Sequence, residues 1–304
     1  MPENVLTVIA SPLAAAATAA AVDAAVDSLR RLGALIGGRS WLAADIACDI
    51  LFDELDPDQA DAAARSGIAA ALGAAPIDVV AQPILGRRKL LLLADMESTI
   101  IANEMVDELA DLLGLKAKVA AITRRAMNDE VDFAAALRER VALLKDLPES
   151  ALADAGARIR ITPGARELVA TMRANGAFTA LVSGGFRVYT ARIRDELGFD
   201  LDVANDLVIA DGRLAGTVGE PIFGRDAKLT TLKRLAADRT LPLAATLAVG
   251  DGANDIAMIE AAGLGIAYHA RPAVAARARR RIEHNDLTAL LYAQGYSAEQ
   301  IVGR

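Results

Sequence analysis

The chain has 304 residues, of which 54% are hydrophobic, and a formal net charge of −7 at pH 7. This length is enough for about two domains, each with a sizeable core. The acidic balance argues against a nucleic-acid-binding protein, which needs a basic face, and the single cysteine, Cys48, excludes an internal disulfide and fits a reducing cytoplasm.

The first part of the chain, residues 1–85, predicts a small α+β domain. Strands are expected over residues 4–10, 34–53 (two strands) and 77–84, and helices over residues 13–32 and 56–73. The order strand–helix–strand–strand–helix–strand is that of a ferredoxin-like fold and resembles the ACT modules that sense amino acids beside some metabolic enzymes. We expect a regulatory or dimerisation domain, which leaves a homodimer open.

The stretch from residue 13 to residue 22 is apolar and consists mostly of alanine. It is too short to span a bilayer, and no basic segment precedes it as in a signal peptide. We therefore expect an amphipathic helix here, no membrane segment and a cytoplasmic protein.

The second part, residues 86–304, predicts an α/β domain. Its first strand, residues 90–94, is a continuous apolar run, which is typical of a parallel strand covered on both faces. Four segments with helical periodicity follow between residues 103 and 162, and we expect them to form a helical cap. From residue 162 onward strands and helices alternate, which predicts a Rossmann-like parallel sheet.

The last predicted helix covers residues 273–282 and contains a basic run at residues 277–281. We expect this run on a solvated helix face, since a binding patch is the less common use of such a sequence. A hairpin is expected within residues 202–217, with Asp211 and Gly212 at its turn.

Polar side chains follow the ends of three predicted strands. Asp95 and Glu97 follow the first strand, Ser183 with two glycines follows the second, and Asp251 and Asp255 follow the third. In an open α/β sheet such strand ends line one crevice, so we expect these side chains to converge.

The chemistry of these groups points to phosphoryl transfer. Asp95 and Asp251 can hold one Mg²⁺, which shares its coordination shell with water and phosphate. Ser183 with its glycine amides can cradle a phosphate, and Lys228 supplies a positive charge. Asp95 can then act as the nucleophile, while Glu97 protonates the leaving oxygen and later deprotonates water.

Each of these pieces also has an ordinary alternative. Asp95 can simply cap a helix, Ser-Gly-Gly is usually a turn, and a lone lysine such as Lys228 usually lies at the surface. The full set, in this order and at strand ends, is what indicates a site.

The chain resembles the haloacid dehalogenase superfamily in its four motifs: Asp95-Met-Glu-Ser-Thr99, Ser183-Gly-Gly185, Lys228 and Gly250-Asp-Gly-Ala-Asn-Asp255. Over residues 88–292 it resembles the phosphoserine phosphatase family through Asn103-Glu104, Phe133, residues 137–144, Lys145-Asp-Leu-Pro148 and residues 182–186. The resemblance implies Mg²⁺-dependent hydrolysis of O-phospho-L-serine to L-serine and phosphate through an aspartyl-phosphate, as the last step of serine biosynthesis.

The resemblance also implies residue roles. Asp95 would be the nucleophile and Glu97 the general acid/base, and Mg²⁺ would be bound by Asp95, the main-chain carbonyl of Glu97 and Asp251. Asp255 would orient the lysine or the metal's waters. The phosphoryl group would be held by Ser183, Gly184, Lys228 and Asn254. The rest of the substrate would be bound by Glu104, Met127, Phe133 and Arg140.

The roles of Glu104 and Arg140 agree with elementary chemistry, because a glutamate can pair with the ammonium of phosphoserine and an arginine can grip its carboxylate. The alternative is that both residues only stabilise helix surfaces.

One position departs from the family pattern, which has aspartate where this chain has Glu97. The added methylene moves the acid by about one bond length. Two other functions stay open: a phosphatase or phosphotransferase for another small phosphate ester, and a weakly catalytic amino-acid-binding regulator.

Overall fold

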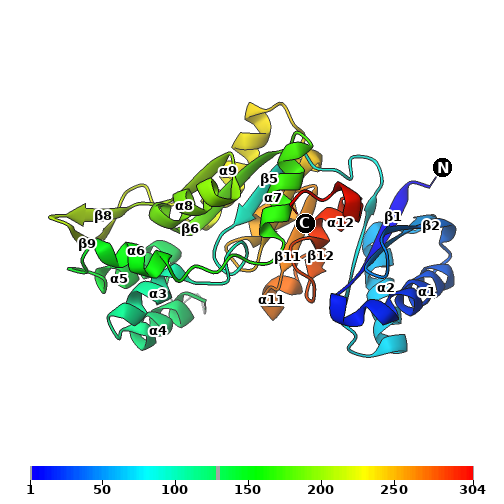
Figure 1. The fold of residues 1–304 in the computed structure, drawn as a ribbon, viewed down its shortest axis with the longest axis horizontal. Helices are drawn as coiled ribbons and strands as arrows, with labels where there is room; N and C mark the ends of the chain where they lie inside the picture. The colour runs from blue at the N-terminus through cyan, green and yellow to red at the C-terminus, as the bar shows by residue number, and fades with distance from the viewer. Residues whose placement is uncertain (1, 128–130, 304) are drawn as a thin grey trace.

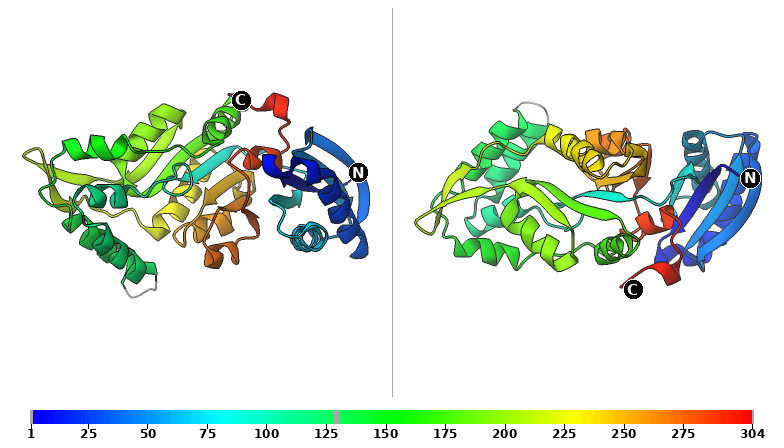
Figure 2. Two further views of the ribbon diagram at one scale, coloured as in Figure 1. Left: turned by 60° about the horizontal axis from the view of Figure 1, so that its bottom comes forward. Right: turned by 90° about the horizontal axis from the view of Figure 1, so that it is seen from above.

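The computed structural model describes residues 2–127 and 131–303 (Figure 1). An antiparallel four-stranded sheet contains the N-terminal residues, a six-stranded parallel sheet forms the centre, and helices with a two-stranded hairpin form a cap. The N-terminal sheet and the cap lie at opposite ends of the molecule, with the parallel sheet between them (Figures 1 and 2).

The N-terminal sheet has the strand order β2-β3-β1-β4. Its elements are β1 (Asn4–Ala10), α1 (Thr18–Arg31), β2 (Leu35–Ala43), β3 (Ala47–Asp53), α2 (Pro57–Leu72) and β4 (Ile77–Pro83). Alternate strand residues such as Leu6 and Val8 form an apolar cluster with the two helices. This arrangement confirms the predicted ferredoxin-like order.

The helix expected over residues 13–32 is divided in two. Pro12–Ala17 form a 3₁₀ helix that begins after Ser11, and α1 follows from Thr18. Within the described residues, the stretch Pro12–Arg31 is long and apolar enough to cross a membrane by length and composition alone, and 44% of its apolar window is buried. The buried side of α1 packs on the N-terminal sheet, as the core helix of a globular domain does.

The central sheet has the order β12-β11-β10-β5-β6-β7, and all its strand pairs are parallel. Its strands are β5 (Leu91–Asp95), β6 (Phe178–Phe186), β7 (Leu201–Asn205), β10 (Thr246–Gly250), β11 (Leu264–Tyr268) and β12 (Arg280–Ile282). Its helices are α7 (Ala165–Ala174), α8 (Arg187–Leu197), α9 (Arg225–Asp238), α10 (Ile256–Ala261), α11 (Pro272–Ala275) and α12 (Ala289–Ala293). Short 3₁₀ helices cover Leu243–Ala245 and Ala298–Gln300. The predicted α/β class with a Rossmann-like sheet is confirmed.

The two faces of β5 are covered by different helices. Leu91 and Leu93 pack in one apolar cluster with α9 and α10, while Leu92 and Ala94 pack in another with α7, α8 and α12. All five residues of β5 are buried, as a continuous apolar run predicts for a central parallel strand.

The cap is helical, as the sequence predicts. It consists of α3 (Met105–Leu112), α4 (Lys116–Met127), α5 (Phe133–Ala142) and α6 (Ser150–Gly156), with the hairpin of β8 (Leu207–Ala210) and β9 (Arg213–Val218) beside α5. Asp211 and Gly212 turn this hairpin, and both have positive φ angles, 51° and 70°.

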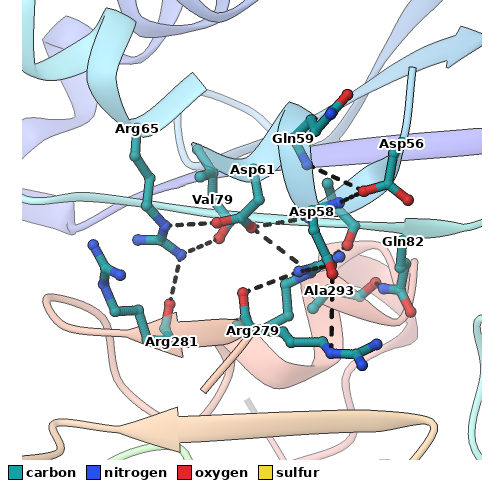
Figure 3. Close-up of polar contacts among 12 residues, drawn as sticks. Asp56, Asp58, Gln59, Asp61, Arg65, Val79, Gln82, Arg279, Arg281 and Ala293 are labelled. Atoms are coloured by element: carbon teal, nitrogen blue, oxygen red, sulfur yellow. Dashed lines mark hydrogen bonds and ion pairs between the residues drawn. The ribbon is translucent and has the colours of Figure 1, made fainter. Parts of the chain in front are cut away.

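The predicted basic helix over residues 273–282 is wrong beyond Ala275. Only Pro272–Ala275 are helical, and Arg280–Ile282 form β12, which pairs with β11. Arg280 is only 7% exposed: its guanidinium donates to the Ala81 carbonyl and lies 2.7 Å from an oxygen of Asp58. Figure 3 shows this contact region, in which α2 faces the segment around Arg279 and Arg281. Part of the basic run therefore forms a strand that contacts the acidic residues of α2, a helix distant in the sequence.

A second group of polar contacts joins the N-terminal sheet to the rest of the chain. The fully buried carboxylate of Asp78 accepts hydrogen bonds from the backbone N–H groups of Glu283, His284 and Asn285, and from the Asn285 side chain. Arg87 binds Asp49 through two nitrogens at 2.6 and 2.7 Å. These contacts fix the N-terminal sheet against the parallel-sheet part.

Candidate active site

The three strand ends singled out from the sequence lie side by side. Asp95 is the last residue of β5, and β5 is flanked by β6, which contains Ser183, and by β10, which Asp251 follows. The strands are in register, with Ala94 opposite Val249 and Asp95 opposite Val182. The sheet therefore brings the predicted nucleophile, hydroxyl and second aspartate to one edge.

Lys228, a residue of α9, extends its side chain to the same edge of the sheet. Its ammonium lies 2.5 Å from an oxygen of Asp95 and 2.6 Å from an oxygen of Asp255. Burial disfavours the charge on Lys228, but Asp255 and Asp95 outweigh it, and the pKa of Lys228 lies above its usual value. The second oxygen of Asp255 accepts from the N–H of Gly252 at 2.9 Å, so Asp255 is placed to orient the lysine.

Carboxylates crowd around the lysine. One oxygen from each of Asp95, Asp251 and Asp255 lies within 4.8 Å of the others. Burial, together with repulsion from Asp255, raises the pKa of Asp95 well above its usual range and that of Asp251 to about 7. Buried oxygen donors with excess negative charge suit a hard divalent cation, so the residues present fit Mg²⁺.

Glu97 follows two residues after Asp95 and points toward the cap. Its Oε1 accepts a hydrogen bond from the backbone N–H of Met105 at 2.7 Å. Burial and the neighbouring Glu104 carboxylate raise the pKa of Glu97 to about 8. A carboxyl with this pKa can both give and take a proton near neutral pH.

The segment around Ser183 differs from the prediction. The sequence predicts that Ser183 and its two glycines follow the strand, but β6 continues to Phe186 with a register shift, and α8 begins at Arg187. The glycine amides therefore lie in the end of a strand. Ser183 is fully buried, and its hydroxyl accepts from the N–H of Gly185 at 2.9 Å.

The cap closes on the core at Gly184. A Cβ atom at Gly184 would lie 2.8 Å from the ring of Phe133, the first residue of α5. A side chain at this position would therefore collide with the cap, and glycine permits the close approach. Phe133 is thus an apolar wall beside the strand end of Ser183.

Two charged cap residues lie near Glu97. Glu104 precedes α3, and its Oε1 accepts from the hydroxyl of Ser98 at 2.7 Å. Burial raises the pKa of Glu104 and lowers that of Arg140, whose charge interacts with Glu97 and Glu104. The structure thus gathers an anionic and a cationic group beside the predicted acid.

The remaining predicted residues are less informative. Asn254 lies in the loop between β10 and α10, with its amide oxygen close to Gly252. Met127 ends α4, but its side chain lies outside the part of the chain that the structure describes.

Sequence reasoning missed Asn205 and Arg271. Asn205 ends β7; its amide donates to the carbonyls of Gly184 and Phe223, so it ties the segment around Ser183 and Gly184 to the loop before α9. Arg271 follows β11, and its charge acts on Glu104 and Asp251. Both lie at the carboxyl ends of strands of the same sheet, and this position is the signal that could have identified them.

Comparison with known proteins agrees with this geometry. A family model of the haloacid dehalogenase-like hydrolases matches residues 92–260. The chain is 37% identical over 298 residues to a phosphoserine phosphatase of Streptomyces coelicolor, with 98% of this chain and 72% of that protein covered.

Two solved structures are also similar. An HAD family hydrolase from Salmonella enterica subsp. enterica serovar Typhi has a TM-score of 0.82 at 27% identity, covering 95% of this chain and 97% of that one. A phospho-aspartyl intermediate analogue of a phosphoserine phosphatase has a TM-score of 0.63 at 41% identity, covering 67% of this chain and 98% of that one. The chain therefore belongs to the haloacid dehalogenase-like hydrolases and, among these enzymes, to the phosphoserine phosphatase family.

Proposed function

We propose that this enzyme hydrolyses O-phospho-L-serine to L-serine and phosphate through an aspartyl-phosphate on Asp95, with Mg²⁺ as cofactor. The observation that supports this most is the pair of opposite charges, Glu104 and Arg140, both of which act on Glu97, two residues after Asp95. Phosphoserine has an ammonium and a carboxylate in addition to its phosphate, and this pair complements both. The relatives named phosphoserine phosphatase support the same substrate.

The proposed reaction has two steps. In the first, an oxygen of Asp95 bonds to phosphorus, the bond between phosphorus and the serine oxygen breaks, and Glu97 gives its proton to that oxygen. In the second, water attacks the aspartyl-phosphate, Glu97 takes the proton of the water, and phosphate leaves. Glu97 thus ends in the state in which it began.

The surrounding residues bind and orient the reacting groups. Lys228 lies between Asp95 and Asp255, where its charge balances the phosphoryl oxygens. Ser183, Gly184 and Asn254 are proposed to hold the same group. Mg²⁺, bound by Asp95, Asp251 and the Glu97 main-chain carbonyl, would supply positive charge to the phosphoryl oxygens.

The cap is proposed to select the substrate. Glu104 would bind the ammonium and Arg140 the carboxylate through a two-pronged contact, with Phe133 and Met127 forming the apolar wall. Esters that lack these two charges leave both cap residues unpaired, which penalises their binding.

We also propose the roles of the two parts of the chain. Residues 86–304 would form the phosphatase domain, with the cap at about residues 103–162, and residues 1–85 would form a regulatory or dimerisation domain. A cytoplasmic enzyme of serine biosynthesis fits this activity.

The test is phosphate release from O-phosphoserine against a panel of phosphate esters, with Mg²⁺ and with a chelator. We expect phosphoserine to be the preferred substrate and the chelator to abolish turnover. Preference for another ester would overturn the substrate, and phosphoryl transfer to an added alcohol without free phosphate would indicate a phosphotransferase. If the protein binds serine but neither turns over phosphoserine nor becomes labelled at Asp95, the result would instead indicate a regulator.

A further inference from the structure

We propose that Glu97 has a second task besides proton transfer: its carboxylate caps the N-terminus of α3 and so fixes the start of the cap. The hydrogen bonds at this helix start support the proposal. The N–H groups of Asp107 and Glu108 both donate to the carbonyl of Glu104, at 3.1 Å each. The N–H of Met105 donates outside the helix, to Oε1 of Glu97 at 2.7 Å.

The residue at the usual capping position does not perform this task. Glu104 occupies the N-cap of α3 but makes no side-chain hydrogen bond to the helix, because its carboxylate accepts from the Ser98 hydroxyl at 2.7 Å. N-cap positions normally satisfy an N–H of the first turn with their own side chain. Here the carboxylate of Glu97, seven residues before Glu104, accepts from an N–H of the first turn instead. The side chain of Glu104 is therefore available for another contact.

The hydrogen bond matters because its donor is buried. Met105 is 0% exposed and belongs to the apolar cluster that extends from the parallel sheet into the cap. Water cannot easily replace Glu97 at this N–H, and a buried N–H without a partner is costly.

The length of the side chain makes the contact possible. A Cβ atom at Gly185 would lie only 2.7 Å from Oε2 of Glu97, so the carboxylate extends from the strand-end side to the cap side of the site. An aspartate would withdraw the carboxylate by one carbon–carbon bond, about 1.5 Å. With the backbone unchanged, this takes its oxygen out of hydrogen-bond distance of Met105.

This arrangement makes Glu97 a positioning residue for Glu104, which directly precedes Met105 in the chain. A loose start of α3 would let Glu104 move. The expected effect on substrate binding rests on the proposed function, whereas the expected effect on the helix does not.

The experiment separates the two tasks with two substitutions. Glu97→Gln keeps an oxygen acceptor at full length but cannot transfer a proton. Glu97→Asp keeps the acid but shortens it. Hydrogen exchange of the Met105 amide is measured by NMR in both variants and in Glu139→Asp, which shortens an exposed cap glutamate by the same methylene.

We expect the Met105 amide to exchange about 2- to 30-fold faster in Glu97→Asp, the fold-change that corresponds to the stability lost when a helix N-cap is removed, and near the wild-type rate in Glu97→Gln and Glu139→Asp. Equal protection of the Met105 amide in Glu97→Asp and wild type would overturn the proposal. An equal loss of this protection in Glu97→Gln and Glu97→Asp would overturn it as well. If Glu97→Asp does not fold, Glu97→Leu, which lacks the acceptor at similar size, takes its place in the same comparison.

Kinetics provide the second measurement. We expect kcat to fall by about 10²–10⁴ in Glu97→Gln. In Glu97→Asp we expect KM to rise for phosphoserine more than for an aryl phosphate, which has no ammonium for Glu104. An equal rise in KM for both substrates would overturn the proposal that Glu97 positions Glu104. If the wild type does not hydrolyse phosphoserine, the proposed function fails, while the exchange data still decide whether Glu97 caps α3.

Discussion

The side chain of Asp95 can act as a nucleophile only as a negatively charged carboxylate. Asp95→Asn keeps the size of this side chain, but an amide oxygen does not attack phosphorus at a useful rate. We expect turnover of phosphoserine and labelling of the enzyme by a phosphoryl donor to be lost while the fold is retained. Phosphate release and circular dichroism measure this, and substantial turnover by the folded variant would exclude Asp95 as the nucleophile.

Arg140 offers a second test at the scale of one residue. Arg140→Ala removes a charged contact to the substrate carboxylate, which should cost about 1.5–3 kcal/mol, or roughly ten- to a hundredfold in kcat/KM for phosphoserine. An aryl phosphate without a carboxylate should be much less affected. Equal losses on the two substrates would show that Arg140 supports the cap rather than recognition.

At the scale of elements, the site consists of the ends of β5, β6 and β10, where buried carboxylates crowd together. The pKa of Asp251 is about 7 and that of Glu97 about 8, both above the values of unfolded carboxyls. Raised carboxyl pKa values stabilise the metal-free protein at low pH, and this stability is lost as pH rises through about 7–8.

Mg²⁺ should offset the part of this loss that comes from Asp251, because the ion is proposed to bind the deprotonated carboxylates of Asp95 and Asp251. We expect saturating Mg²⁺ to raise Tm more at pH 8 than at pH 6, where protons compete for Asp251. Thermal unfolding at the two pH values, with and without Mg²⁺, measures the difference. Equal shifts in Tm at both pH values would show that these carboxylates do not bind the ion.

The sequence predicted the elements that depend on local pattern and failed where a distant partner decides. The apolar run before Asp95 suffices to predict β5, since the apolar side chains on both faces of that strand are buried. The end of β6 was not predictable, because its extension to Phe186 depends on Asn205, whose amide binds the carbonyl of Gly184. Glu97 was identified as an acid, but its contact with Met105 required the position of α3.

At the scale of the whole molecule, buried polar contacts hold the N-terminal sheet to the parallel-sheet part. Arg280 is 7% exposed and pairs with Asp58 at 2.7 Å, whereas Arg277, three residues earlier, forms an exposed pair with Glu260. Arg280→Met should therefore lower the free energy of unfolding by about 1–3 kcal/mol, because it leaves the buried carbonyl of Ala81 without this donor.

The matched control is Arg277→Met, which should cost less than about 1 kcal/mol because exposed ion pairs contribute little. Urea unfolding of the two variants gives the comparison. Similar stabilities would show that the contact around Arg280 does not hold the two parts together.

During synthesis on the ribosome, the N-terminal sheet emerges long before the residues that cover it. Arg280 lies 222 residues after Asp58, and Asn285 lies 207 residues after Asp78. At about 5–20 residues per second, this interval lasts roughly 10–40 s. For that time Ile9 and Val80, which end up in the shared apolar cluster, face water or a chaperone. The nascent chain thus exposes an aggregation-prone apolar surface that is buried in the folded protein.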